Sequence, residues 1–324
     1  MSASDRPAIV RALREGGSFL VLLHELPDGD SVGATLAMLL ALRRLGKRAM
    51  AVGADRVPRP YQFLPMAEQV RVTGEVSLES WDIAIVLDCA DPERAGDAWP
   101  LARRAKKLIN IDHHVTNIGY GDLNLVDPGA SATAELVYAL VRDLGIEVDR
   151  DMADCLFMGI MTDTGSFRYA NASPRTFRLA AELMEAGASP EALASSVWES
   201  RSISSLRLLA RALTTLKVSD DGRMAWLTVD DVALAETGAD EQEVEGFVNY
   251  PRSLEGVEVA MLFRPMADGR TRVAFRSKGR ADVSRVARAL GGGGHPRAAG
   301  CVLRSGPDGA VDRVLAAARQ EVSS

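Results

Sequence analysis

The sequence predicts an α/β protein in which an N-terminal parallel-sheet domain is joined by a helical linker to a smaller C-terminal α/β domain. Short apolar runs alternate with segments of helical periodicity through roughly the first 150 residues, as expected for repeated βαβ units. A further group of strand-like runs follows residue 216. The length of 324 residues suits two domains of moderate size.

The strands expected in the first domain are short and rich in branched apolar residues. They cover 18–24, 48–54, 82–88 and 107–112. Helical periodicity covers 34–46, 133–144, 151–161 and 174–186. Gly46, Gly145 and Gly187 end three of these segments, and glycine is the residue most often found just after a helix.

The helical linker is expected to begin at Ser189-Pro190-Glu191, because this tripeptide has the form of a helix start. Helical spacing continues to about Leu216. We therefore expect domains at 1–188 and 216–324, with the linker at 189–215. In the second domain, strands are expected at 223–229, 257–263 and 271–277, and a helix at 282–290.

The composition is that of a globular protein and excludes disordered, fibrous and membrane classes. Hydrophobic residues make up 47% of the chain and mean hydropathy is −0.01. No run approaches the roughly 20 apolar residues of a membrane span, and the first residues lack the apolar core of a secretory signal. Cys89, Cys155 and Cys301 are too scattered for a disulfide framework. We expect a cytoplasmic location and no membrane partner.

The net charge of −6 is unevenly distributed along the chain. Residues 264–297 hold nine Lys or Arg against two Asp, a net charge of +7, which leaves −13 for the remainder. Such a segment suits phosphate or nucleic acid. The alternative is a solvated basic face without a ligand.

Residues able to bind metal gather where the predicted strands end. In open parallel sheets, ligands bind at the carboxyl ends of the strands, so residues remote in sequence converge there. The set consists of His24, Asp28, Asp30, Asp88, Asp112, His113, His114 and Asp163.

A purely structural role does not explain why so many aspartates lie in one place. Two like charges about 4 Å apart repel by about 4 kcal/mol at an effective dielectric near 20. Cations would remove this cost, and imidazole with carboxylate favours Mn²⁺, Fe²⁺, Co²⁺ or Mg²⁺ over a structural zinc. The number of ligands fits two metals that share an aspartate, an arrangement used for phosphoryl transfer.

Four segments in this order resemble the motifs of the DHH phosphoesterase superfamily: HELPDGDSVGA, VLDCAD, NIDHHVTN and GIMTDTGSFRYAN. The later segment FRSKGRADVSRVARALGGGGHPRAAG resembles the signature of the DHH-associated domain. Chain length and the forms TDTGSFRY and GGGGH are most similar to the NrnA-type branch of bacterial oligoribonucleases and pAp phosphatases. The resemblance reaches from about residue 20 to 303 and implies the fold predicted above.

The resemblance also implies how the ligands divide between two metals. His24, Asp28 and Asp88 would hold one ion, and Asp30, Asp88, His113 and Asp163 the other. Asp88 would be the bridge. His114 would lie beside the reacting phosphate and Asp112 would orient its neighbours. The ions implied are two divalent metals, Mn²⁺ first, with Mg²⁺ or Co²⁺ as alternatives.

Four consecutive glycines, Gly291, Gly292, Gly293 and Gly294, indicate a place where the backbone approaches something closely. Amide groups without side chains can cradle phosphate, although a flexible linker is the alternative. By resemblance, Arg276 and His295 would hold a terminal phosphate or base. Arg168 is a candidate for contacting phosphate, and a purely structural role is an equally good interpretation.

The function expected is hydrolysis of oligoribonucleotides of two to five nucleotides to 5′-mononucleotides, and of pAp (3′-phosphoadenosine 5′-phosphate) to AMP. His114 would stabilise charge on the phosphoryl oxygens or protonate the leaving group. A cyclic-dinucleotide phosphodiesterase acting on c-di-AMP or pApA is the main alternative. A nucleotide-binding sensor without turnover is an alternative of another class. A homodimer is a further alternative, although no particular residue of the sequence indicates one.

Overall fold

Six parallel strands form the sheet of the first of two units into which the chain divides, Met1–Ser200 and Arg201–Ser324. The computed structural model describes residues 5–77 and 80–322. The strand order is β3-β2-β1-β4-β5-β6. These strands are β1 (Ser18–Leu22), β2 (Arg48–Gly53), β3 (Arg71–Val72), β4 (Ile83–Leu87), β5 (Lys107–Asp112) and β6 (Leu123–Val126).

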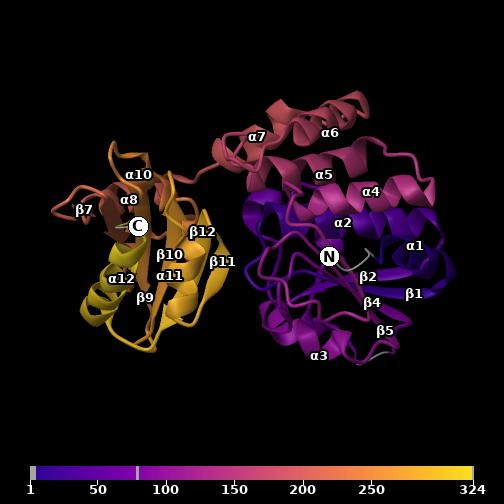
Figure 1. Ribbon diagram of the computed structural model, residues 1–324, viewed down its shortest axis with the longest axis horizontal. Helices are drawn as coiled ribbons and strands as arrows, with labels where there is room; N and C mark the ends of the chain where they lie inside the picture. The colour runs from indigo at the N-terminus through magenta and orange to yellow at the C-terminus, as the bar shows by residue number, and fades with distance from the viewer. Residues whose placement is uncertain (1–4, 78–79, 323–324) are drawn as a thin grey trace. The chain divides into compact units, whose positions relative to one another are not determined.

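Helices cover both faces of this sheet, so side chains along each strand alternate between two cores (Figure 1). Phe19 and Val21 of β1 face the larger core, and Leu20 and Leu22 face the smaller one. The α-helices are α1 (Arg6–Glu15), α2 (Gly29–Arg44), α3 (Trp99–Ala102), α4 (Thr133–Leu144), α5 (Arg150–Asp163), α6 (Pro174–Glu185) and α7 (Pro190–Trp198). Single 3₁₀ segments are η1 (Arg59–Tyr61), η2 (Ala67–Gln69), η3 (Thr73–Glu75) and η4 (Pro92–Ala98).

The second unit has a mixed sheet of order β11-β12-β10-β9-β8-β7, in which only the β8–β9 pair is parallel among the pairs described. Its strands are β7 (Lys217–Val218), β8 (Met224–Thr228), β9 (Val259–Pro265), β10 (Thr271–Ser277), β11 (Gly293–His295) and β12 (Ala298–Leu303). Its helices are α8 (Ile203–Leu213), α9 (Asp231–Thr237), η5 (Glu241–Val244), α10 (Asn249–Ser253), α11 (Val283–Ala289) and α12 (Pro307–Val322).

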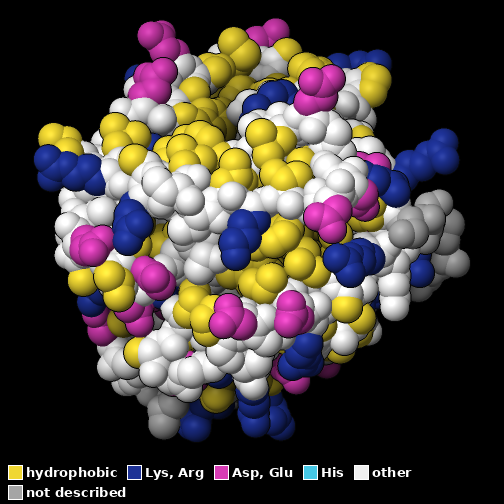
Figure 2. All heavy atoms as spheres, turned by 90° about the vertical axis from the view of Figure 1, so that its left-hand side faces the viewer, with side chains coloured by type: hydrophobic (Ala, Val, Ile, Leu, Met, Phe, Trp, Pro, Cys, Tyr) yellow, Lys and Arg dark blue, Asp and Glu magenta, His cyan; other side chains and the backbone are white. Residues whose placement is uncertain are grey.

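Two cores also flank the second sheet. One core contains residues of α11 and α12, and the other contains residues of α8, α9 and η5. Figure 2 shows apolar side chains among charged ones on one face of the molecule. The most exposed apolar residues of α8 are Ile203 and Leu206. Within the described ranges, no helix has the length and apolarity needed to span a membrane.

The fold class predicted from the sequence is confirmed, and the element boundaries differ in informative places. Helix α2 begins at Gly29 instead of residue 34, because Asp28 caps it. Helix α5 continues to Asp163, two residues beyond the predicted end. The domain limits stay predictions; the expected linker at 189–215 contains α7 of the first unit and α8 of the second.

Candidate metal centre

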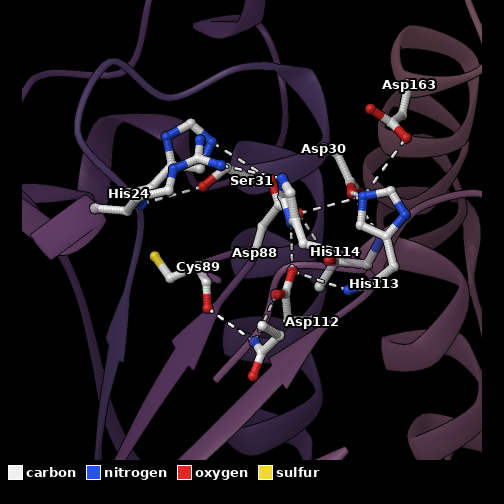
Figure 3. A network of polar contacts seen from close by, with 12 residues as sticks. His24, Asp30, Ser31, Asp88, Cys89, Asp112, His113, His114 and Asp163 are labelled. Carbon is white, nitrogen blue, oxygen red and sulfur yellow. Dashed lines mark hydrogen bonds and ion pairs between the residues drawn. The ribbon is translucent and has the colours of Figure 1, made fainter. Parts of the chain in front are cut away.

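Three adjacent strands of the parallel sheet deliver the predicted ligands to one edge. β1, β4 and β5 are neighbours in the sheet, and their carboxyl ends lead to His24, Asp88 and the Asp112–His114 segment. In Figure 3, Asp88 lies between His24 on one side and His113 on the other. All of these residues are buried.

Two further carboxylates come from the N-terminal end of α2, Asp28 as its N-cap and Asp30 in its first turn. The Asp28 side chain caps the helix by accepting hydrogen bonds from the backbone N–H groups of Asp30 and Ser31. Asp30 is buried, and its carboxylate accepts hydrogen bonds from the backbone N–H groups of Thr133 and Ala134 at 2.6 and 2.9 Å. Because these groups begin α4, its helix dipole stabilises the charge on Asp30.

Asp163 ends α5 and reaches the same site because α5 packs very closely against α2. A Cβ atom at Gly33 would lie 2.2 Å from the backbone oxygen of Cys155, and one at Gly159 would lie 2.6 Å from Oδ1 of Asp30. Both positions therefore require glycine. The close approach places Oδ2 of Asp163 3.5 Å from Nε2 of His113.

The ligand atoms form three overlapping groups, in each of which all atoms lie within 4.8 Å of one another. The groups are His24, Asp28 and Asp88; Asp30, His113 and Asp163; and Asp88, His113 and His114. Asp88 belongs to the first and the third, and its Oδ1 is 3.6 Å from Nε2 of His113. This arrangement is compatible with two cations on either side of the Asp88 carboxylate.

Buried imidazole nitrogens fit a metal better than they fit a closed hydrogen-bond network. Nε2 of His24 is buried and makes no hydrogen bond, while it lies 3.4 Å from Oδ2 of Asp88 and 3.6 Å from Oδ1 of Asp28. Its other ring nitrogen contacts the backbone oxygen of Glu25 at 2.7 Å. That contact directs the lone pair of Nε2 toward the carboxylates, as in metal-binding histidines.

Protons take the place of cations when no metal is bound. Burial lowers the pKa of His24 and the nearby Arg94 lowers it further, but Asp28 and Asp88 outweigh both and raise it to about 9. For His113, burial likewise acts downward, and the surrounding aspartates raise the pKa to about 10. Burial and the charge of Asp88 raise the pKa of Asp30 well above its usual range. These shifts describe an excess of negative charge that divalent ions would neutralise.

Asp88 is held in a strained conformation at the centre of this cluster. Its φ is +58°, a left-handed value that non-glycine residues rarely adopt. The side chain accepts a hydrogen bond of 2.8 Å from Oγ1 of Thr133 and its backbone N–H donates to the oxygen of Ile111. Such strain persists at functional sites where the surrounding structure fixes it.

Asp112 orients the second histidine of the pair. It is fully buried, and its Oδ1 lies 2.6 Å from Nδ1 of His114 and accepts the backbone N–H of His113 at 2.8 Å. Its Oδ2 accepts a hydrogen bond of 2.6 Å from Asn117. Asp112 therefore contacts residues of the site and does not belong to any of the three ligand groups among the described residues.

Arg168 and several arginines of the basic segment already have partners within the protein. Nε of Arg168 donates to the backbone oxygen of Gly165 at 2.6 Å. In the second unit, Arg264 is buried and paired with Asp231, Arg270 is paired with Asp268, and Arg285 with Glu321. The charge of the basic segment is thus partly balanced by neighbouring carboxylates.

The glycine run is ordered, and Gly293 and Gly294 belong to β11. A Cβ atom would lie 2.1 Å from the oxygen of Gly300 at Gly292 and 2.6 Å from the oxygen of Ala298 at Gly294, so strand β12 requires glycine at these two positions. Gly291 has a left-handed φ of +81°, which also favours glycine. The strand register places Arg276 and His295 in one row, on either side of Ala298. Two strand spacings separate such residues by about 10 Å. The side chain of His295 lies outside the described part of the structure.

The sequence did not single out several residues that contact the site. Thr133 and Asn117 bind aspartates of the cluster, Asn171 donates to the backbone oxygen of Asp163, and a guanidinium nitrogen of Arg94 lies 3.0 Å from Nε2 of His114. Asn117, Asn171 and Arg94 lie within or just after the quoted motifs. Their polar side chains beside the metal-binding motifs could have marked these three residues as candidates. Thr133 was readable only as a helix start.

Comparison with known proteins gives matches to both halves of the chain. Residues 18–160 match the DHH family, N-terminal domain, and residues 225–324 match the DHHA1 domain. The bifunctional oligoribonuclease and PAP phosphatase NrnA of Thermus thermophilus is 37% identical over 308 residues, which are 95% of this chain and 91% of that protein. The NrnA of Bacillus subtilis is 29% identical and the match covers 95% and 96% of the two chains.

A solved structure has the same fold over nearly its whole length. The exopolyphosphatase-related protein from Bacteroides fragilis matches with a TM-score of 0.89, covering 97% of this chain and 95% of that chain. The sequences are 23% identical, so this likeness concerns the fold.

Proposed function

The chain belongs to the DHH family of phosphoesterases, and from this premise we propose that it hydrolyses short oligoribonucleotides to 5′-mononucleotides and pAp to AMP. The main support for the proposal is the set of three ligand groups, two of which share Asp88 and two of which share His113. The named activities of the Thermus and Bacillus relatives support the choice of substrates.

We propose that the metal-binding residues divide as the family resemblance implies. His24, Asp28 and Asp88 would hold one divalent ion, and Asp30, Asp88, His113 and Asp163 the other. When bound, two such ions would supply Lewis acidity that activates water and offsets negative charge on the phosphoryl oxygens. Oxygen and nitrogen donors without thiolate favour Mn²⁺, with Mg²⁺ and Co²⁺ as alternatives.

The protein's own groups set the geometry of the reaction. The α4 N-terminus fixes Asp30, Thr133 fixes Asp88, and Asp112 fixes the ring of His114. Because all these partners are buried, the side chains lose little entropy when substrate binds. We assign His114 to the side of the reacting phosphate and Asp112 to its orientation.

The second unit would provide the contacts that select short substrates. In this proposal Arg276 and His295, with the turn of Gly291–Gly294, bind the end of the oligonucleotide distant from the cleaved bond. Arg276 lies on β10 and its guanidinium also donates to the oxygen of Phe275 at 3.0 Å. Arg168 remains a candidate phosphate contact in the first unit. We further propose a cytoplasmic location, where such RNA fragments arise.

Product release from the dinucleotide pApA tests the function. The purified protein with Mn²⁺ is assayed for 5′-AMP on pApA, pAp, c-di-AMP and an RNA of a few dozen nucleotides. Fast cleavage of pApA and pAp with little action on the long RNA is the expected result. Preferred cleavage of c-di-AMP would favour the cyclic-dinucleotide alternative. Bound metal without hydrolysis of any substrate would contradict the proposal and favour a nucleotide-binding sensor.

A homodimer is a separate possibility, and sedimentation of the same sample measures it.

A further inference from the structure

Arg94 lies beside the acidic cluster, although neither the composition nor the spacing of the sequence singles it out. Nη1 of Arg94 is 3.0 Å from Nε2 of His114. Its guanidinium forms no ion pair with any carboxylate in the part of the chain that the structure describes. The carboxylates of Asp88, Asp28 and Asp112 favour its charged form without touching it, so most of its N–H donors stay available to an anionic ligand.

The backbone fixes Arg94 to the loop that carries the first metal-binding residue. Oδ1 of Asp91 accepts the backbone N–H of Arg94 at 3.2 Å, which begins η4. The backbone oxygen of Arg94 accepts a hydrogen bond of 2.6 Å from the N–H of Glu25, the residue after His24. Gly96, with φ +53°, allows the turn to lie against Ala54. The position of Arg94 is therefore set by the same segments that build the site.

The contact with Arg94 defines the proton on His114. A guanidinium has donors and no acceptor, so Nε2 of His114 must accept the hydrogen bond from Arg94. The ring proton is then on Nδ1, which donates to Oδ1 of Asp112 at 2.6 Å. In this arrangement His114 has no proton on Nε2 to give to a leaving group. The contacts therefore speak against His114 as the proton donor and leave the guanidinium of Arg94 as the group beside it that can donate to a phosphoryl oxygen.

Arg94 removes the negative charge that the aspartates would keep after two divalent ions bind. The cluster contains five aspartates, namely Asp28, Asp30, Asp88, Asp112 and Asp163. Two divalent ions would leave a charge of −1, which would repel a phosphodiester. The permanent charge of Arg94 brings the total to zero. One of its five N–H groups is used on His114, so four remain for a ligand.

We propose that Arg94 is a catalytic residue that donates hydrogen bonds to a non-bridging oxygen of the reacting phosphate. This inference rests on the proposed phosphoesterase function. The planar guanidinium matches phosphate in shape and charge. The interaction strengthens as negative charge develops on the phosphoryl oxygens, so it accelerates the reaction more than it tightens substrate binding.

The test compares Arg94→Ala and Arg94→Lys with Arg103→Ala, a control that removes an exposed arginine of the same unit. With pApA as substrate, Arg94→Ala should lower kcat by about 10² to 10³ with a smaller change in KM. Arg94→Lys should retain an intermediate activity, and added guanidinium chloride at millimolar concentration should restore part of the activity of Arg94→Ala. Metal content per chain should equal that of the wild type in all three variants.

Binding of AMP to the metal-loaded protein gives a readout that does not depend on turnover. Calorimetry should show weaker AMP binding by Arg94→Ala and unchanged binding by Arg103→Ala. This result would support the contact between Arg94 and a phosphate even if the wild type hydrolysed none of the substrates, so failure of the contact and failure of the proposed function are distinguishable. The inference is overturned if Arg94→Ala keeps kcat within threefold of the wild type. It is also overturned if its activity is lost together with the metals and guanidinium restores nothing.

Discussion

Replacement of Asp88 by asparagine isolates the charge of the residue that joins the ligand groups. Asp88 has φ +58°, where asparagine is tolerated and alanine is strained, so Asp88→Asn preserves the backbone better than Asp88→Ala. The amide oxygen can still accept the hydrogen bond from Thr133. The variant therefore removes one negative charge with little change in packing.

The magnitude follows from the distances around this carboxylate. Its oxygens lie 3.4 Å from Nε2 of His24 and 3.6 Å from Nε2 of His113, so ions held by these histidines would lie within about 4 Å of it. At that distance the interaction of one carboxylate charge with a divalent ion is about 8 kcal/mol at an effective dielectric near 20, twice the value for two unit charges. Since about 1.4 kcal/mol is a factor of ten, loss of half of this interaction would already weaken the binding of an ion about a thousandfold.

Metal content by mass spectrometry and Mn²⁺ titration by calorimetry measure this effect, and pApA hydrolysis measures its consequence. We expect fewer than two ions per chain at concentrations that saturate the wild type, and at least a thousandfold loss of activity. Asp97→Asn, which changes an exposed aspartate of η4, is the matched control. Two ions bound with wild-type affinity, together with activity within tenfold of the wild type, would refute the bridging role of Asp88.

Three further predictions address substrate binding, protonation and packing. Arg276→Ala should raise KM for pApA about tenfold with little change in kcat, as steady-state kinetics would show; a fall in kcat at constant KM would contradict its assignment to substrate binding. In the metal-free protein, His24 and His113 have folded-state pKa values of about 9 and 10, above the ordinary 6.5. Their stabilising contribution is complete below pH 6.5 and is lost as pH rises through these values, so the thermal midpoint should fall between about pH 8 and 10, whereas a rising midpoint would contradict the shifts. Gly33→Ala places a Cβ atom 2.2 Å from the oxygen of Cys155, so chemical denaturation should show a loss of about 1–3 kcal/mol, and unchanged stability would disprove the close contact between α2 and α5.

The strand ends of the site were predictable because local signals and topology agree there. β1, β4 and β5 are continuous buried runs, and the residues that follow them converge at the carboxyl edge of any parallel sheet. The predicted helix start at residue 34, which leaves Asp30 outside the helix, was wrong, because a Gly-Asp-Ser segment has low helix propensity except beside a capping residue such as Asp28.

Residues whose position depends on tertiary contacts were not predictable. Arg94 points to His114 because its backbone is bonded to Glu25, which is 69 residues away in the chain. Thr133 reaches Asp88 through the packing of α4 on α2. The glycine run was expected to serve a ligand, and part of its composition is explained by the close approach of β11 to β12. Sequence patterns do not give the distances between residues that are far apart in the chain, so these contacts could not be predicted.

Crystals grown with Mn²⁺ and measured at the manganese absorption edge would locate the metal ions themselves. We expect two anomalous peaks about 3.5–4 Å apart, both in contact with the carboxylate of Asp88. One peak should contact His24 and Asp28, and the other Asp30, His113 and Asp163. A single peak, or two peaks neither of which contacts Asp88, would contradict the two-metal centre on which the proposed phosphoesterase activity depends.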